Sequence, residues 1–216
     1  MSRKLLSGKE GSHKVSRRAV LAGTAMGAAA ALTRFPSPAV AQDKSFKLGL
    51  LTVKTGPLAQ GGIQMEQGVL TYLKETNYMI GGRKVDFISA DTGGNPAGTK
   101  TKAQELVERD KVDVILGPLA AFELYAISDY IKEQKMPTLS LAAADNLTQR
   151  LPNPYLLRAS ATSSQAMQAM GHYAATELKL KRAVTIVEDF AFGYEQMGGF
   201  QAAFQANGGC VVNKLW

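Results

Sequence analysis

The sequence predicts an α/β fold in which a parallel β-sheet carries helices on both faces. Between residues 46 and 216, short apolar segments alternate with longer segments whose apolar residues recur at helical spacing. A helix between successive strands crosses over the sheet, so consecutive strands run parallel. The predicted strands are residues 46–53, 84–90, 112–116, 137–141, 155–158, 183–187 and 210–216.

The predicted helices follow from apolar spacing and from the residues at their ends. Residues 61–76 carry Met65, Val69 and Leu73 four positions apart, which places them on one helical face. The pair Asn95-Pro96 predicts a helix start, because asparagine caps free backbone donors and proline suits the first helical position. The helix that starts there is predicted to end near Arg109. Further helices are predicted over residues 122–134, 163–178 and 194–206, and Gly81-Gly82 predicts a turn.

The first 41 residues have the pattern of a bacterial export signal. Arg17 and Arg18 precede an apolar segment that ends at Leu32, and Ala39-Val40-Ala41 forms a small-x-small cleavage site. A twin arginine here is typical of export by the twin-arginine translocase. The apolar segment is short for a membrane span, which makes an anchor or a buried helix the less favoured interpretation. We therefore expect cleavage after Ala41 and a periplasmic mature protein.

Charge gives no support to nucleic-acid binding. The export signal holds seven basic residues and one acid, which accounts for +6 of the net charge of +7. The remaining +1 is too small for a basic patch that would bind nucleic acid.

Cys210 is the single cysteine and cannot form an internal disulfide. We expect it to be a small apolar strand residue, with a reactive thiol as the alternative.

Enzyme chemistry has little support in the sequence. His13 lies in the export signal, which leaves only His172, in a predicted helix. A single histidine cannot build a multi-histidine metal site, and no nucleotide-binding or nucleophile motif is present. The acids at the strand ends are expected to be solvated or to cap helices; they are Asp91, Glu123, Asp145 and Asp189. We expect no catalytic residues, no metal and no cofactor.

The ends of the predicted strands are the candidate ligand site, because ligands bind outside the carboxyl ends of strands in parallel sheets. These ends are residues 52–55, 91–93, 117–120, 140–144 and 188–190. Two of them are rich in alanine. A later strand is followed by Phe190 and Phe192. Tight packing without a ligand role is the alternative for the alanines, as core packing is for the phenylalanines.

Several segments resemble the branched-chain amino-acid binding proteins of ABC transporters. Residues 47–51 with Thr55-Gly56-Pro57 resemble the opening of that family, and residues 136–148 resemble its P-x-[IL]-S-x-A-A strand end. Residues 155–165 resemble the first crossing between its lobes, and residues 184–193 resemble the first strand and [YF]-G loop of its second lobe. The order and spacing of these segments together are specific.

The resemblance implies a type I periplasmic binding protein clamshell that captures a small carboxylate and delivers it to an ABC permease in the inner membrane. In the family, backbone amides and hydroxyls from two strand-end loops hold the ligand carboxylate. By position these loops are formed by Leu119, Ala120, Ala121, Ala142, Ala143 and Ala144. Alanine replaces serine or threonine in both loops, and Phe190 and Phe192 add aromatic surface. We therefore expect an apolar or aromatic acid as readily as a branched-chain amino acid.

The same resemblance divides the chain into lobe one, residues 42–158, and part of lobe two, residues 159–216. Members of the family are considerably longer, so the second lobe is expected to be incomplete and the chain to be a poor binder as it stands. An exported sensory ligand-binding module of the same fold is an alternative. An exported α/β enzyme is a further alternative, but it lacks a recognisable catalytic constellation.

Overall fold

A computed structural model describes residues 44–216, so the predicted export signal, with its twin arginine and cleavage site, lies outside the described residues. Within residues 44–216, no helix combines the length and the apolar character needed to cross a membrane.

A six-stranded sheet forms the first part of this structure, in the order β2-β3-β1-β4-β5-β6. Every neighbouring pair is parallel except β2–β3, which confirms the predicted parallel sheet. The antiparallel β2 was not predicted; it is two residues long and is joined to β3 by Gly81 and Gly82, whose φ angles are 57° and 80°. The strands are β1 (Phe46–Thr52), β2 (Met79–Ile80), β3 (Arg83–Asp91), β4 (Val114–Leu116), β5 (Thr138–Ser140) and β6 (Leu156–Arg158).

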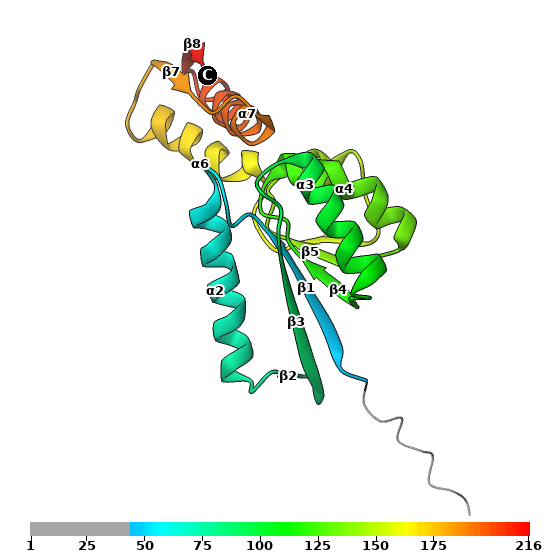
Figure 1. Cartoon of the computed structure of the whole chain (residues 1–216). Coiled ribbons are helices and arrows are strands. Elements are labelled where there is room, and N and C mark those ends of the chain that lie inside the picture. The colour runs from blue at the N-terminus through cyan, green and yellow to red at the C-terminus, as the bar shows by residue number, and fades with distance from the viewer. Residues whose placement is uncertain (1–43) are drawn as a thin grey trace, which may run out of the picture. The chain divides into compact units, whose positions relative to one another are not determined.

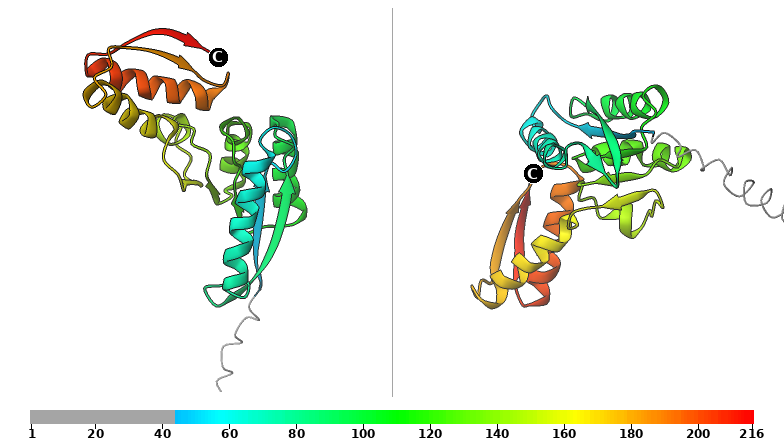
Figure 2. Two further views of the ribbon diagram at one scale, coloured as in Figure 1. Left: turned by 90° about the vertical axis from the view of Figure 1, so that its left-hand side faces the viewer. Right: turned by 90° about the horizontal axis from the view of Figure 1, so that it is seen from below.

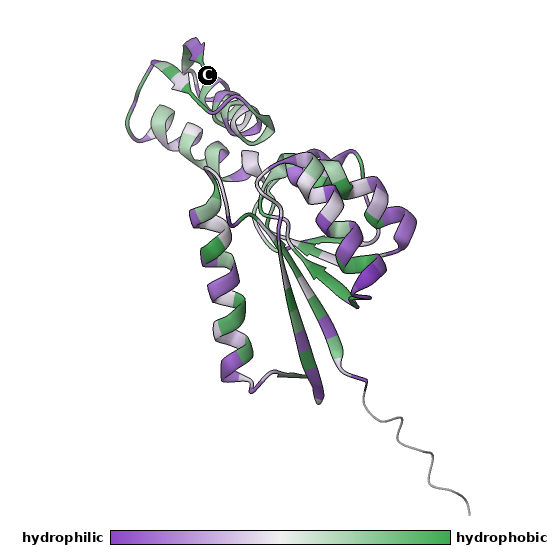
Figure 3. Cartoon of the chain, viewed as in Figure 1, coloured by the Kyte–Doolittle hydropathy of each residue, from purple (hydrophilic) through white to green (hydrophobic). Residues whose placement is uncertain are grey.

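Helices cover both faces of this sheet (Figure 1). Helix α2 (Ala59–Glu75) lies on one face, and α3 (Pro96–Gln104) and α4 (Ala121–Gln134) lie on the other. Along β1, Leu48 belongs to the core under α2 and Leu51 to the core under α3 and α4. Burial on both faces is what a parallel sheet requires. Hydrophilic residues occupy the sides of α3 and α4 that face away from the sheet (Figure 3).

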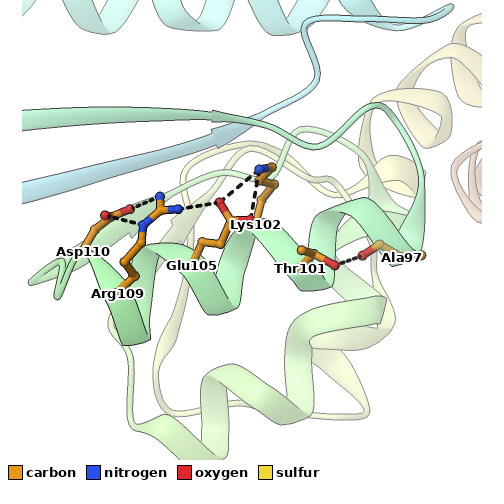
Figure 4. A network of polar contacts seen from close by, with 6 residues as sticks. All are labelled: Ala97, Thr101, Lys102, Glu105, Arg109 and Asp110. Carbon is orange, nitrogen blue, oxygen red and sulfur yellow. Dashed lines mark hydrogen bonds and ion pairs between the residues drawn. The ribbon is translucent and has the colours of Figure 1, made fainter.

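The predicted helix that ends at Arg109 changes character before its end. Asn95 caps α3 through a hydrogen bond from the Gly98 amide, as predicted, and the π-helix η1 (Glu105–Arg109) completes the segment. A partly exposed polar network runs along it, with the pairs Lys102–Glu105 at 3.0 Å, Arg109–Glu105 at 3.2 Å and Arg109–Asp110 at 2.9 Å (Figure 4). The hydrogen bond from Arg109 lowers the pKa of Asp110. Exposed pairs of this kind contribute little stability, so the network mainly shapes the surface.

A second sheet contains β7 (Arg182–Ile186) and β8 (Cys210–Leu215), which pair in parallel. Helices α6 (Ser163–Thr176) and α7 (Ala191–Ala206) lie on one of its faces (Figure 2), where Phe204 is fully buried. Ile186, on the other face, is 75 % exposed. The two sheets meet the expectation of an α/β protein with two parallel sheets, and the lobe boundary at residue 158 stays a prediction. Cys210 lies in a strand, as predicted, and is exposed.

Candidate functional site

A cavity of about 260 Å³ lies beyond the carboxyl ends of β4, β5 and β7. This is where parallel sheets bind ligands. Its volume is just below the usual range for ligand sites, about 300–1,000 Å³, so it suits one small ring or a short branched chain. The lining residues are Leu58, Leu119, Ala120, Ala121, Leu141, Ala143, Glu188, Phe190 and Phe192.

Most of the predicted site residues meet at this cavity. Leu119, Ala120, Ala121, Ala143, Phe190 and Phe192 line it together, although they come from three separate loops. Ala142 and Ala144 do not line it and are buried, with 1 % and 0 % exposure. The predicted site residues did not include Leu58, Leu141 and Glu188, which also line the cavity, although Leu141 and Glu188 belong to strand ends that the sequence predicted. Whether a ligand contacts these residues stays a prediction.

Aromatic side chains join the two sides of the cavity. The rings of Phe190 and Phe192 are stacked, with centroids 6.1 Å apart and planes 23° apart. Phe122, on α4, meets Phe190 edge to face at 5.9 Å. Such pairs stabilise by about 0.5–1.5 kcal/mol beyond the area they bury. Phe190 is therefore held against α4 before any ligand enters.

The first turn of α4, beneath the loop after β4, contains a buried carboxyl group. Glu123 is fully buried and accepts a hydrogen bond from the Ala120 N–H at 3.0 Å. It also accepts from the hydroxyls of Thr92 and, at 3.4 Å, Thr99. Glu123 thus caps α4, as expected for an acid at this position, but it is not solvated. Its bond to Ala120 removes one of the amides that the sequence offered to a ligand.

The amides of Ala121 and Ala143 remain available at the cavity. In the part of the chain that the structure describes, neither N–H group has a hydrogen-bond acceptor. Ala121 is the first residue of α4, where helical N–H groups lack intrahelical partners and the helix dipole favours a negative charge. By contrast, Ala142 donates its N–H to the hydroxyl of Ser140 at 3.0 Å. Two lining residues therefore have N–H groups without an acceptor, one at the start of α4 and one in the loop after β5.

Asp91 fixes the loop that follows β1. Its carboxylate accepts from the Lys54 and Gly93 amides at 2.8 and 2.9 Å and from the Thr55 hydroxyl at 3.0 Å. Burial raises the pKa of Asp91, but these hydrogen bonds outweigh burial and lower the pKa below its usual value. This contact anchors the chain just before Leu58, which lines the cavity.

Glu195 ties α7 to α4 and to the segment that follows β5. Both of its carboxylate oxygens lie 3.1 Å from the Asp145 N–H, and the Tyr125 hydroxyl donates to it at 3.5 Å. Burial, followed by the charge of Glu195, raises the pKa of Tyr125. At the start of α7, a Cβ on Gly193 would lie 2.2 Å from the Glu188 carbonyl oxygen, so glycine is required there. These contacts position Phe190 and Phe192 at the cavity.

Another depression, of about 430 Å³, runs along β3 and carries more charge. Its charged residues already have partners: Lys54 pairs with Glu66, which lies outside the depression, and Lys102, Glu105 and Arg109 belong to the network described above. It thus has no comparable set of unused binding groups.

Within residues 44–216, no three histidine, cysteine or acidic side chains gather as a metal site would need. His172 is exposed on α6.

The fold and the place of the cavity are those of a type I periplasmic binding protein. Residues 45–215 match the family model described as periplasmic binding protein, and the chain belongs to that family. The family and the fold are those of solute-binding proteins.

Curated and solved relatives agree with this assignment. The chain is 27% identical over 171 residues to Leu/Ile/Val-binding protein homolog 6 of Brucella abortus, covering 78% of this chain and 43% of the relative. It is 31% identical, with a TM-score of 0.75, to an ABC-transporter solute-binding protein of Rhodopseudomonas palustris BisB5 in complex with 3,4-dihydroxybenzoic acid, covering 79% and 47%. It is 28% identical, with a TM-score of 0.75, to a solute-binding protein of R. palustris in complex with benzoate, covering 80% and 48%. The chain thus spans less than half the length of these relatives.

Proposed function

We propose that this chain forms the ligand-binding site of a periplasmic solute-binding protein that captures a small apolar or aromatic carboxylate and presents it to an ABC permease. The observation that carries the proposal is the composition of the cavity. It combines the stacked rings of Phe190 and Phe192 with the unused amides of Ala121 and Ala143. The rings suit an apolar body, and the amides suit a carboxylate.

An aromatic acid fits this cavity better than an amino acid does. No lining residue has a hydroxyl group. The nearby Ser140 hydroxyl is already used, since it donates to the Pro118 carbonyl at 2.8 Å and accepts from Ala142. The R. palustris relatives were solved with benzoates, which supports this choice. A branched-chain amino acid is the second candidate, because the curated relatives are named for leucine, isoleucine and valine.

Calorimetric titration with benzoate and with L-leucine tests the proposal. The informative variant is Ala143→Asp, which places a carboxylate beside one of the two open amides. Like charges in contact cost several kcal/mol, so benzoate affinity should fall by about 100-fold or more. The control is Ala97→Asp, on an exposed first turn of α3, where an acid suits the helix dipole and should leave binding unchanged. Equal benzoate affinity in both variants, with unchanged circular dichroism, would refute this site.

The proposal includes export by the twin-arginine translocase, supported by Arg17, Arg18 and the cleavage pattern at Ala39–Ala41. Replacing both arginines by lysine should leave precursor in the cytoplasm, and normal appearance of mature protein in the periplasm would contradict this route.

Permease and ATPase genes beside this gene would favour transport over the sensory alternative. Turnover of a bound acid would instead favour the enzyme alternative.

A further inference from the structure

The cavity contains a single ionisable side chain, Glu188. The other lining residues are leucine, alanine and phenylalanine. Among the described residues, the Glu188 carboxylate has no hydrogen-bond or ion-pair partner. It is exposed, two residues beyond the end of β7, so solvent hydrates it while the cavity is empty. A ligand that fills the cavity would therefore meet this carboxylate.

We propose that Glu188 selects ligands that carry a hydrogen-bond donor on their apolar body, so that hydroxylated aromatic acids are preferred to the unsubstituted acid. This rests on the proposed function, because it assumes that the cavity binds aromatic carboxylates. A ligand that covers Glu188 displaces its water, and burying a carboxylate without a partner is costly. A ring hydroxyl compensates for this desolvation cost by donating a hydrogen bond to the carboxylate. Such a charge-assisted hydrogen bond is stronger than a neutral one.

Electrostatics also orients the ligand. Glu188 follows a strand of the second sheet, whereas the open amides of Ala121 and Ala143 follow strands of the first. The ligand carboxylate is attracted by the amides and repelled by Glu188. The apolar end of the ligand is therefore the end that meets Glu188. A donor on that end gains the contact, and a bare ring does not.

The neighbouring acid provides a matched control. Asp189 carries the same charge one residue further on, but it does not line the cavity, and it accepts a hydrogen bond from the Tyr194 hydroxyl. Glu188→Gln and Asp189→Asn each remove one negative charge from the same segment. Both should raise the affinity for every anionic ligand slightly through the lost repulsion. Only the first should change the discrimination between ligands.

The experiment is calorimetric titration of the wild-type chain and both variants with benzoate, 3-hydroxybenzoate and 4-hydroxybenzoate. In the wild type, at least one hydroxy acid should bind about tenfold more tightly than benzoate, as one hydrogen bond to a charged group provides. Glutamine retains an oxygen acceptor without the charge, and a neutral hydrogen bond is roughly half as strong. The preference should therefore fall to about threefold in Glu188→Gln. It should remain about tenfold in Asp189→Asn.

The possible failures are distinguishable. Benzoate binding with no preference for either hydroxy acid in the wild type would overturn the role of Glu188 and leave the proposed function standing. A preference that survives unchanged in Glu188→Gln would also overturn it, because the partner of the hydroxyl would then lie elsewhere. Absence of binding to all three acids would overturn both the inference and the aromatic ligand class.

Discussion

Substituting Gly62 by alanine should destabilise the protein, although alanine favours helices. Gly62 lies in α2, directly against the end of β1. A Cβ at this position would stand 1.6 Å from the Val53 carbonyl oxygen and 2.9 Å from the Thr52 hydroxyl oxygen. Ordinary contact begins at 3.4 Å, so α2 and β1 would have to separate by more than 1 Å. The Thr52 hydroxyl, which donates to the Gly62 carbonyl at 3.3 Å, would also lose its partner.

The magnitude follows from two opposing effects. Overpacking a tight contact costs about 1–3 kcal/mol, and the atom at issue is a backbone oxygen that cannot rotate away. Alanine in place of glycine in a helix contributes about 1 kcal/mol in the opposite direction. Gly68, two turns later in α2, has no atom within 4 Å of a built Cβ. Gly68→Ala should therefore stabilise by about 1 kcal/mol, and Gly62→Ala should be the less stable of the two by about 1–3 kcal/mol.

Urea unfolding followed by circular dichroism measures both variants against the wild type. A difference of 1 kcal/mol corresponds to about 2–4 °C in Tm for a chain of this size, so thermal melts provide a second readout. Because Leu58 lies one turn before Gly62 and lines the cavity, Gly62→Ala should also weaken benzoate binding. Equal stabilisation by the two alanines would refute the close approach of α2 to β1.

Two further predictions concern other parts of the structure. Gly199→Ala should loosen the packing of α6 on α7, because its Cβ would lie 2.4 Å from the Ser164 carbonyl oxygen, whereas the exposed Gly198→Ala meets nothing within 4 Å. Hydrogen exchange should therefore speed up in α6 and α7 for Gly199→Ala alone, and equal exchange in both variants would contradict the packing. The pKa of Asp91 is lower in the folded state than in the unfolded chain. Its carboxylate therefore stabilises the fold fully at pH values above the unfolded pKa of about 3.9, and this stabilisation is lost as the pH falls through the folded pKa. Asp91→Asn should lower the Tm at pH 7 and reduce its decline below about pH 4, as melts across this pH range would reveal; an unchanged pH profile would exclude this role.

Most of the fold could be predicted because its elements are long enough to repeat a pattern. The spacing of Met65, Val69 and Leu73 shows one helical face, and α2 does cover residues 59–75. Strand β2 could not be predicted in this way, because two residues cannot show an alternation. The change to a π-helix at Glu105 was also hidden, since it alters backbone hydrogen bonding without changing which side chains are apolar.

The candidate site was predictable to the level of its loops but not of its residues. Parallel topology brings the strand ends together, which is why six predicted residues share one cavity. After β5 the alternation of a strand continues: Ala142 and Ala144 are buried, whereas Leu141 and Ala143 line the cavity. A run of three alanines gives no signal for this alternation, because all three side chains are alike.

Glu123 explains why the remaining donors matter so much. Its buried carboxyl group lies beneath the loop after β4 and already accepts from the Ala120 N–H, so this amide is not open to a ligand carboxylate. Under the proposed function, carboxylate binding then depends on the few open amides, with no hydroxyl in the lining to assist. Apolar contact has to contribute a larger share, and burying a side chain of phenylalanine size contributes about 1.5–3 kcal/mol. A flat ring against Phe190 and Phe192 obtains this contact with little conformational entropy to lose, whereas a branched chain has more freedom to lose. The same alanines that leave the site short of donors are therefore our reason for proposing an aromatic acid rather than an amino acid.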